Sequence, residues 1–234
     1  MKVVFISPCF NASNNLKKLI DSVTSQIDSR WEHVLIDDIS TDSTSEKYSQ
    51  LTSSDSRFKL IKNNEKKYAL RNIIEVARNY ENDEDTIIAT IDGDDQLCNE
   101  NTVSLLIESY EKGFDVVWTG HRWDVNGINI SKAMPENVDP YAWVWSTSHL
   151  RTFKSTLLKK ISDRNFKDTK GTWFKRGYDQ ALMLPVLSLT NRRKYIDEIC
   201  YLYNIDSVSV NDRDWAEMSQ ISTINLVRAR GFLK

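Results

Sequence analysis

Short apolar runs alternate with amphipathic stretches through the first half of the chain. The apolar runs are rich in β-branched residues and have the length of buried strands, so we expect strands at residues 3–6, 33–36, 58–61, 86–91 and 115–119. Between them, apolar positions recur at helical spacing. One such stripe consists of Leu16, Leu19, Ile20, Val23 and Ile27, and further helices are expected at residues 46–51, 69–80 and 99–112.

This alternation predicts an α/β fold. Strands that are apolar throughout and separated by helices form a mostly parallel central sheet with helices on both faces. Ligands of such sheets bind beyond the carboxyl ends of the strands. Three polar turns follow these ends: residues 8–11, the pair Asp37 and Asp38, and the DGDD turn at residues 92–95. We therefore expect these three turns to meet at one edge of the sheet.

The second half, from about residue 122, has a less regular pattern and many aromatic residues. Helices are expected at residues 153–161 and 179–189, with a kink at Pro185, and a strand at residues 199–203. Residues 215–227 have the pattern of an amphipathic helix. We expect that helix to dock on the protein, although its pattern also fits a helix lying on a membrane surface.

The charge balance and the cysteines exclude several classes of protein. With 31 basic and 33 acidic residues the formal charge is −2, so the basic excess of a nucleic-acid or membrane-surface binder is missing. The three cysteines lack the spacing of a disulfide framework or a zinc site, which favours a reducing compartment. No window reaches the roughly 18 apolar residues of a transmembrane segment. We expect a cytoplasmic protein.

The DGDD turn places Asp92, Asp94 and Asp95 close together after an apolar strand. As a solvated turn it would need no partner. At the mouth of a buried sheet, however, two carboxylates about 5 Å apart repel by roughly 3 kcal/mol at an effective dielectric near 20. A hard divalent cation, Mn²⁺ or Mg²⁺, would relieve this repulsion, because such ions bind carboxylates together with substrate phosphates.

The absence of a glycine-rich loop limits the class of phosphate-containing substrate. It has seven glycines, and none forms the glycine-rich loop of a dinucleotide-binding or P-loop protein. If the protein binds a diphosphate through a metal ion and without such a loop, the remaining reaction classes are nucleotide-sugar chemistry and nucleotidyl transfer.

Four segments in order resemble the family 2 glycosyltransferases, which have the GT-A fold. The segments are SPCFNASNNLKKLIDSVTSQ, HVLIDDISTDST, YALRN and TIDGDD, and the likeness is strongest over residues 3–120. The resemblance implies one GT-A domain over residues 1–234. Residues 1–120 would bind the nucleotide sugar, and residues 121–234 would bind the acceptor and end in a helix.

The resemblance also implies the residues of the donor site. Pro8 and Phe10 would flank the base of the nucleotide, and Asp38 would hydrogen-bond the edge of that base. Asp37, in the same element, could instead serve only to cap the segment that follows it. Arg71 would lie near the diphosphate.

The DGDD turn corresponds to the metal motif of the family. Asp95 would ligate the metal, and Asp94 would contact the ribose or the metal. Asp92 would complete the motif, either as a metal contact or by orienting the turn.

Inverting sugar transfer also needs a carboxylate that takes the proton of the acceptor hydroxyl. Family members place an aspartate at the start of a helix in the second half, which implies Asp179, although Tyr178 stands where an acidic residue usually precedes it. Asp179 could instead serve only as an N-cap, and Asp168 is the second candidate for the base. His149 and Arg151, in a block that resembles one found in some members, would reach the diphosphate or the acceptor, or be structural.

These features predict a metal-dependent, inverting glycosyltransferase that transfers a sugar from a nucleotide diphosphate sugar, with a UDP-sugar as the favoured donor, to a hydroxyl of a glycan or glycoconjugate acceptor. Nucleic acid is not expected as a partner. The alternatives are a nucleotidyltransferase, a non-catalytic nucleotide-sugar binder, and an interaction domain with an acidic loop.

Overall fold

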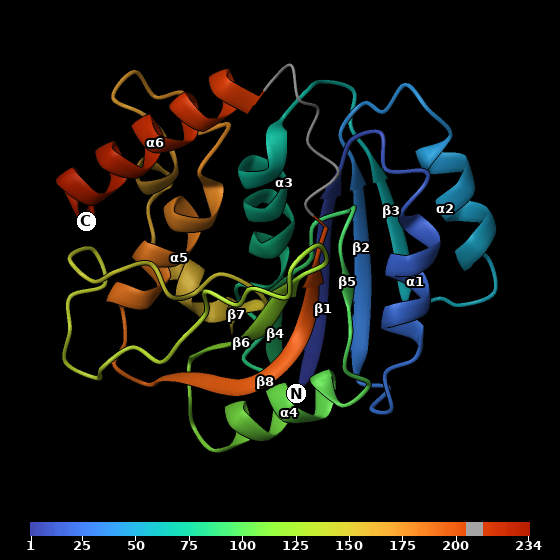
Figure 1. The fold of residues 1–234 in the computed structure, drawn as a ribbon, viewed down its shortest axis with the longest axis horizontal. Helices are drawn as coiled ribbons and strands as arrows, with labels where there is room; N and C mark the ends of the chain where they lie inside the picture. Colours follow the sequence, from blue (N-terminus) through green and yellow to red (C-terminus); the bar gives the residue numbers. More distant parts are fainter. Residues whose placement is uncertain (205–212) are drawn as a thin grey trace.

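A central sheet organises the computed structural model, which describes residues 1–204 and 213–234. Within these residues the sheet has eight strands in the order β3-β2-β1-β4-β7-β6-β8-β5 (Figure 1). The strands are β1 (Lys2–Cys9), β2 (Trp31–Asp37), β3 (Phe58–Lys62), β4 (Thr86–Thr90), β5 (Gln96–Leu97), β6 (Val116–Trp123), β7 (Arg151–Lys154) and β8 (Arg193–Tyr203).

The first four strands in this order are parallel, as expected. β1 pairs in parallel with β2 and β4, and β2 pairs in parallel with β3. The other half of the sheet is mixed: β7 is antiparallel to both β4 and β6, β8 is parallel to β6, and β5 is antiparallel to β8. The carboxyl ends of β1, β2 and β4 consequently lie at the same edge.

Helices cover both faces of the sheet, as Figure 1 shows. On one face lie α1 (Leu16–Thr24), α2 (Thr44–Thr52) and α4 (Thr102–Glu111), and on the other lie α3 (Tyr68–Ala77) and α5 (Tyr178–Ser188). Strand β1 shows why the strands are apolar throughout. Val3 and Phe5 pack on the α1 side, while Val4 and Ile6 pack on the α3 side. Burying each such side chain contributes about 1.5–3 kcal/mol relative to leaving it exposed.

Two of the predicted helices were wrong in part. Residues 153–161 are not one helix, because Arg151–Lys154 forms β7 and Ser155–Lys160 forms a 3₁₀-helix. The strand is stabilised by pairing with β4 and β6, which lie far from it in sequence. Helix α1 ends at Thr24, so Ile27 lies beyond it and is 68% exposed instead of buried.

The C-terminal helix α6 (Arg213–Arg230) docks on the protein, as expected. Val227 is part of the core. The guanidinium of Arg228 donates to Gln180 Oε1 in α5 at 2.8 Å and to the backbone carbonyls of Tyr141 and Trp143 at 2.7 and 2.8 Å. No helix among the described residues is both long and apolar enough to cross a bilayer.

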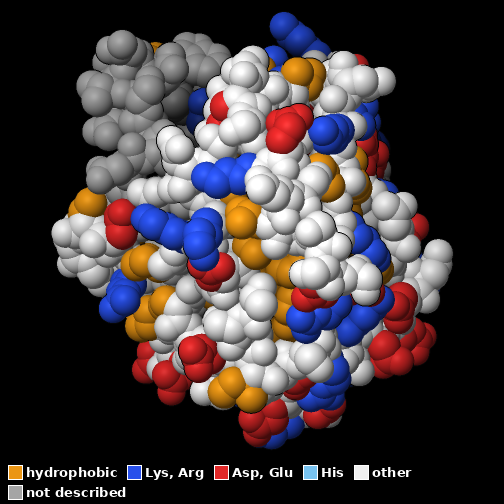
Figure 2. Space-filling model, turned by 90° about the vertical axis from the view of Figure 1, so that its right-hand side faces the viewer, with side chains coloured by type: hydrophobic (Ala, Val, Ile, Leu, Met, Phe, Trp, Pro, Cys, Tyr) orange, Lys and Arg blue, Asp and Glu red, His pale blue; other side chains and the backbone are white. Residues whose placement is uncertain are grey.

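The side of the molecule shown in Figure 2 carries interspersed acidic and basic side chains, in keeping with the near-zero net charge. A hollow of about 430 Å³ lies between the end of α2 and the start of β3, lined by residues such as Tyr48, Thr52 and Phe58. Because β2 and β3 are parallel, the start of β3 is at the opposite edge of the sheet from Asp37 and Asp38. This hollow is therefore separate from the predicted site.

Candidate active site

At the carboxyl edge of the sheet, hydrogen bonds join two of the three polar turns, and a close backbone contact at Gly93 adds the third. The backbone N–H of Asp38 donates to the carbonyl of Cys9 at 2.9 Å, and the N–H of Thr41 donates to Asn11 Oδ1 at 2.8 Å. These bonds connect the turn after β1 with the turn after β2. The predicted convergence of the turns is confirmed.

Gly93 allows the DGDD turn to lie directly against the end of β1. A Cβ atom at this position would overlap the Cβ of Cys9 and would lie 3.3 Å from the carbonyl oxygen of Pro8. Glycine is therefore required here for close approach, although its φ is not in the left-handed region. The contact fixes the position of the flanking aspartates relative to β1.

The carboxylate of Asp38 is buried and accepts several hydrogen bonds from the segment that leads into α3. Its Oδ1 accepts from Asn63 Nδ2 at 2.7 Å and from the Lys67 N–H at 2.8 Å, and its Oδ2 accepts from the Tyr68 N–H at 2.9 Å. Burial alone would raise the pKa of Asp38, but these hydrogen bonds outweigh it and lower the pKa. Asp38 is thus an ionised acceptor that also holds the start of α3.

Asp37 has the capping role that was its alternative interpretation. Its Oδ1 accepts from the Ser40 N–H at 2.8 Å, and its Oδ2 accepts from the hydroxyl of Ser45. Both partners belong to the turn and helix that directly follow β2, so the geometry accounts for Asp37 without a ligand.

Phe10, just after β1, is 51% exposed and has a cation above its ring. The Lys66 ammonium lies 3.2 Å from the ring centroid and donates to the carbonyl of Asp38 at 3.0 Å. Pro8 is buried within β1, one residue before its end. Arg71, on α3, forms ion pairs with Glu65 and Glu75. The roles predicted for Pro8, Phe10, Asp38 and Arg71 toward a nucleotide stay predictions.

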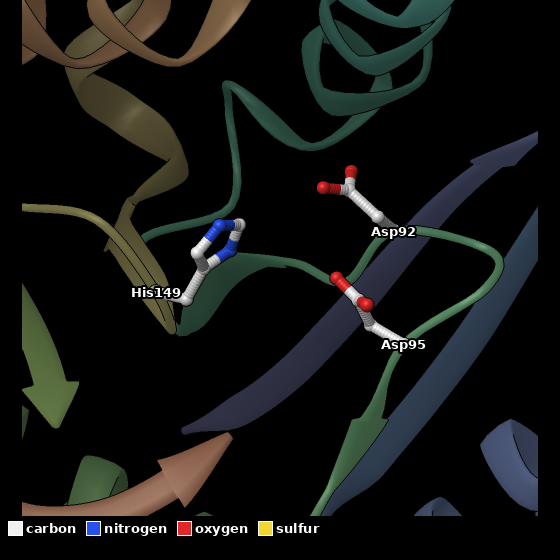
Figure 3. Close-up of side chains that lie close together, drawn as sticks. All are labelled: Asp92, Asp95 and His149. Atoms are coloured by element: carbon white, nitrogen blue, oxygen red, sulfur yellow. The ribbon is translucent and has the colours of Figure 1, made fainter. Parts of the chain in front are cut away.

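The DGDD turn and the segment before β7 bring together a group of side chains that can hold a metal ion. One ligand atom each of Asp92, Asp95 and His149 lies within 4.8 Å of the other two. Figure 3 shows the two aspartates on the turn after β4 and His149 on the segment that leads into β7, grouped around one region. Asp94 lies outside this group, so its predicted contact with the metal or the ribose stays a prediction.

His149 is held by aromatic rings and is 8% exposed. Its imidazole is stacked between Tyr201 and Tyr203, with centroid distances of 4.6 and 5.1 Å. Burial, and then the charge of Arg151, lower the pKa of His149 well below its ordinary value. Among the side chains that the structure describes, the buried Nδ1 atom of His149 has no hydrogen-bond partner. A neutral imidazole with a free nitrogen beside two carboxylates fits a divalent cation.

Asp95 is 2% exposed and accepts hydrogen bonds on both oxygens. Tyr201 donates its hydroxyl to Oδ2 at 2.6 Å, and the Asn204 N–H donates to Oδ1 at 2.7 Å. Burial, followed by the charges of Asp92 and Asp94, raises the pKa of Asp95. The two hydrogen bonds therefore do not outweigh burial and the neighbouring negative charges. A bound cation would neutralise that charge.

The carboxylate of Asp92 contacts Tyr178 and Arg151 in the second half of the chain, and its backbone N–H donates to the Tyr201 hydroxyl oxygen at 3.1 Å. The hydroxyl of Tyr178 donates to Asp92 Oδ1, and the guanidinium of Arg151 lies 3.7 Å from Oδ2. Arg151 is 1% exposed. The buried guanidinium of Arg151 thus lies beside the carboxylates of the DGDD turn.

Asp179 follows Tyr178 in the first turn of α5, after Gly177, which has a φ of +64°. A Cβ at Gly177 would lie 3.1 Å from the carbonyl oxygen of Gln220 in α6. Burial raises the pKa of Asp179, with the positive charge of Arg151 opposing that effect. Asp168 accepts from the N–H groups of Lys170 and Thr172 within its own turn.

A model of the protein family described as glycosyl transferase family 2 matches residues 4–183. The chain belongs to glycosyl transferase family 2. It therefore carries a glycosyltransferase domain. The matched residues include every strand up to β7, the DGDD turn and the start of α5.

Known proteins support this assignment. Over 232 residues the chain is 25% identical to "Glycosyltransferase GlyA" of Streptococcus pneumoniae, a match that covers 92% of this chain and 32% of that protein. The chain thus spans about a third of the length of this relative.

Solved structures match the fold. The S. aureus TarS structure with UDP-GlcNAc aligns with a TM-score of 0.70 at 18% identity, covering 100% of this chain and 68% of that one. The mannosyltransferase PcManGT from Pyrobaculum calidifontis, with GDP-Man and Mn²⁺, aligns with a TM-score of 0.64 at 15% identity, covering 98% and 63%. The predicted GT-A-like α/β architecture is confirmed.

The sequence analysis assigned His149, Arg151 and Tyr178 no definite place in the candidate metal site. His149 lies more than fifty residues after the DGDD turn, so the two do not form a metal-binding motif that could be recognised from short sequence spacing. Its role depends on the insertion of β7 beside β4, where Thr90 pairs with Arg151. This non-local pairing has no signal in one sequence.

Proposed function

We propose that this chain is a metal-dependent, inverting glycosyltransferase that transfers a sugar from a nucleotide diphosphate sugar, favouring a UDP-sugar, to a hydroxyl of a glycan or glycoconjugate. The observation that carries the proposal is the grouping of Asp92, Asp95 and His149 at the carboxyl edge of the sheet. Ligands of α/β sheets bind at this edge, and the family acts on sugars.

The donor would bind over residues 1–120. In this proposal the base of the nucleotide lies against Phe10, and the ionised carboxylate of Asp38 accepts from a ring N–H of the base. Among the described residues Asp38 Oδ1 accepts two hydrogen bonds and Oδ2 accepts one, with the Lys66 ammonium 3.6 Å from Oδ2. A carboxylate offers about four lone-pair positions, so Oδ2 can accept one more bond. The nucleotide sugars in the related structures, UDP-GlcNAc and GDP-Man, support a donor of this class.

Asp92, Asp95 and His149 would hold the cation, with Asp94 as a further contact. When bound, the ion would neutralise the charge that develops on the departing diphosphate. An imidazole nitrogen in the ligand set favours Mn²⁺ over Mg²⁺, which prefers oxygen ligands and keeps several waters. The Mn²⁺ in the PcManGT structure is consistent with this choice.

Asp179 would be the general base. It would take the proton of the acceptor hydroxyl as that oxygen forms a bond to the anomeric carbon and the bond from this carbon to the diphosphate breaks. Attack from the face opposite the leaving group inverts the configuration. The raised pKa of Asp179 suits this role, because a base works best when its pKa approaches the working pH. Residues 121–234 would bind the acceptor.

The expected cytoplasmic location is part of the proposal. The three cysteines, all among the described residues, are free thiols, which is consistent with a reducing compartment.

The proposal is tested by nucleotide binding and by turnover. Thermal unfolding would be recorded with UDP, GDP and dTDP, each with and without Mn²⁺, and release of UDP from UDP-sugars would be followed. We expect the largest shift with UDP and Mn²⁺, since ligand at 100 times its dissociation constant stabilises by about 2.7 kcal/mol. Asp95→Ala should abolish the Mn²⁺-dependent part. The donor assignment is wrong if no nucleotide changes the melting temperature.

A further inference from the structure

The start of α5 carries two neighbouring residues with different contacts. Asp179 is the proposed base, and Tyr178 reaches the metal turn through its hydroxyl, which donates to Asp92 Oδ1. The same hydroxyl oxygen accepts from the guanidinium of Arg151, whose nitrogen is 3.1 Å away. Arg151, Tyr178 and Asp92 are therefore connected in a row.

The chemistry of the three groups fixes the direction of this row. A guanidinium can only donate, and an ionised carboxylate can only accept. The phenol between them must accept from Arg151 and give its one proton to Asp92. Both bonds involve a charged group, which makes them stronger than bonds between neutral partners.

Arg151 is a rigid starting point for the row. It lies in β7 between β4 and β6, where it pairs with Thr90 and Trp118. Its Nε donates to the hydroxyl of Thr90 at 3.1 Å. The guanidinium carbon lies 5.2 Å from the centroid of the Tyr178 ring, so the ring packs against it as well. The position of the phenol is thus set by the central sheet.

We propose that Tyr178 is a positioning residue for the metal site: its hydroxyl, held by Arg151, orients the Asp92 carboxylate toward Asp95 and His149. This inference rests on the proposed function and adds a residue to it. It also links the two halves of the site, because the helix that presents Asp179 would hold a metal ligand through the preceding residue.

Tyr178→Phe is the direct test, because it keeps the ring and its packing and removes only the hydroxyl. Binding of Mn²⁺ to the full chain would be measured from the electron paramagnetic resonance signal of the free ion. We expect the dissociation constant for Mn²⁺ to rise about 10- to 100-fold, as for other residues that orient metal ligands. In turnover, the Mn²⁺ concentration for half-maximal rate should rise by the same factor, with kcat at saturating Mn²⁺ changed only a few-fold.

Tyr195→Phe is the matched control. The Tyr195 hydroxyl also donates to an aspartate, Asp197, at 3.2 Å, but neither residue belongs to the site. This variant should bind Mn²⁺ like the wild type. Melting temperatures without metal show whether a variant only loosens the fold, which would lower the melting temperature and leave the Mn²⁺ constant unchanged.

Arg151→Lys gives a second measurement that does not depend on Tyr178→Phe. The lysine keeps the buried positive charge but lacks the forked guanidinium group, which donates to both Thr90 and Tyr178. It should weaken Mn²⁺ binding, and the double variant should bind no more weakly than the weaker single variant, because both changes break one connection.

The outcomes separate this inference from the proposed function. Suppose that the wild type binds Mn²⁺ and transfers sugar, and that Tyr178→Phe has the same dissociation constant and half-maximal concentration for Mn²⁺. This result would overturn the positioning role and leave the proposed function standing. A wild-type chain that binds no Mn²⁺ would overturn both.

Discussion

The imidazole of His149 lies stacked on the ring of Tyr201, with the centroids 4.6 Å and the planes 17° apart. The hydroxyl of the same tyrosine donates to Asp95 Oδ2 at 2.6 Å. Tyr201, near the end of β8, therefore contacts two members of the candidate metal site at once. Its ring stacks on the imidazole of His149, and its hydroxyl holds the carboxylate of Asp95.

His149→Phe should separate a ligand from a structural imidazole. The variant keeps a ring between Tyr201 and Tyr203 and removes the buried nitrogen that lacks a partner among the described residues. Because an unsatisfied buried polar atom costs about 1–3 kcal/mol, the metal-free variant should be as stable as the wild type or more so. Its melting temperature should no longer rise with Mn²⁺. A variant that keeps the full Mn²⁺ shift would exclude His149 as a ligand.

Gly93→Ala should disturb the DGDD turn, because its Cβ would overlap Cys9. We expect a loss of about 1–3 kcal/mol in the free energy of unfolding, the usual cost of overpacking, and weaker Mn²⁺ binding. Urea unfolding and Mn²⁺ titration would measure the two effects.

Gly113→Ala is the comparison for this change. Nothing lies within 4 Å of its Cβ position, and its φ of +95° makes alanine strained. It should lose stability through the backbone alone and keep its Mn²⁺ affinity. Equal loss of Mn²⁺ binding in both variants would contradict the argument from close approach.

Asp179→Asn should remove the base and leave the donor site intact. General-base catalysis contributes about 10²–10⁴-fold, so we expect a fall of that size in the rate of sugar transfer. The thermal shift with UDP and Mn²⁺ should stay as in the wild type. Asp168→Asn, at the second candidate for the base, should keep most of the activity, because among the described residues the Asp168 carboxylate accepts from N–H groups of its own turn, those of Lys170 and Thr172. The reverse pattern would exchange the two assignments.

His33 should make the fold sensitive to acid. Burial lowers the pKa of His33 to about 3, whereas an unfolded histidine titrates near 6.5. The stability that the neutral ring contributes is therefore complete above about pH 6.5 and is lost as the pH falls from there toward 3. Between about pH 7.5 and 5.5 the loss should be about 1.4 kcal/mol.

The matched variant for this effect is His33→Gln, which can still bond to Ser7 or Tyr48, the two neighbours of the imidazole at 3.0 and 2.7 Å. Its free energy of unfolding in urea should depend less on pH by about 1.4 kcal/mol over this range. Parallel pH profiles for the two proteins would show that His33 is not the group responsible.

The sequence alone determined the alternation of strands and helices and the positions of the turns that form the edge of the site. These features depend on local signals: the apolar runs before Asp37 and Asp92, and the stripe that begins at Leu16. Parallel strands place their carboxyl ends at one edge whatever the lengths of the connections, so the convergence of the turns followed from the order of the elements.

Only the tertiary structure decided which side chains meet at that edge. A metal site needs ligand atoms within a few ångströms of one another, and His149 joins Asp92 and Asp95 because β7 inserts between β4 and β6. The same insertion buries Arg151 beside Tyr178. Antiparallel pairing of this kind depends on backbone hydrogen bonds between distant segments, which leave no periodic pattern in the segment itself. For that reason Phe153 and Lys154, the last two residues of β7, were expected to be helical.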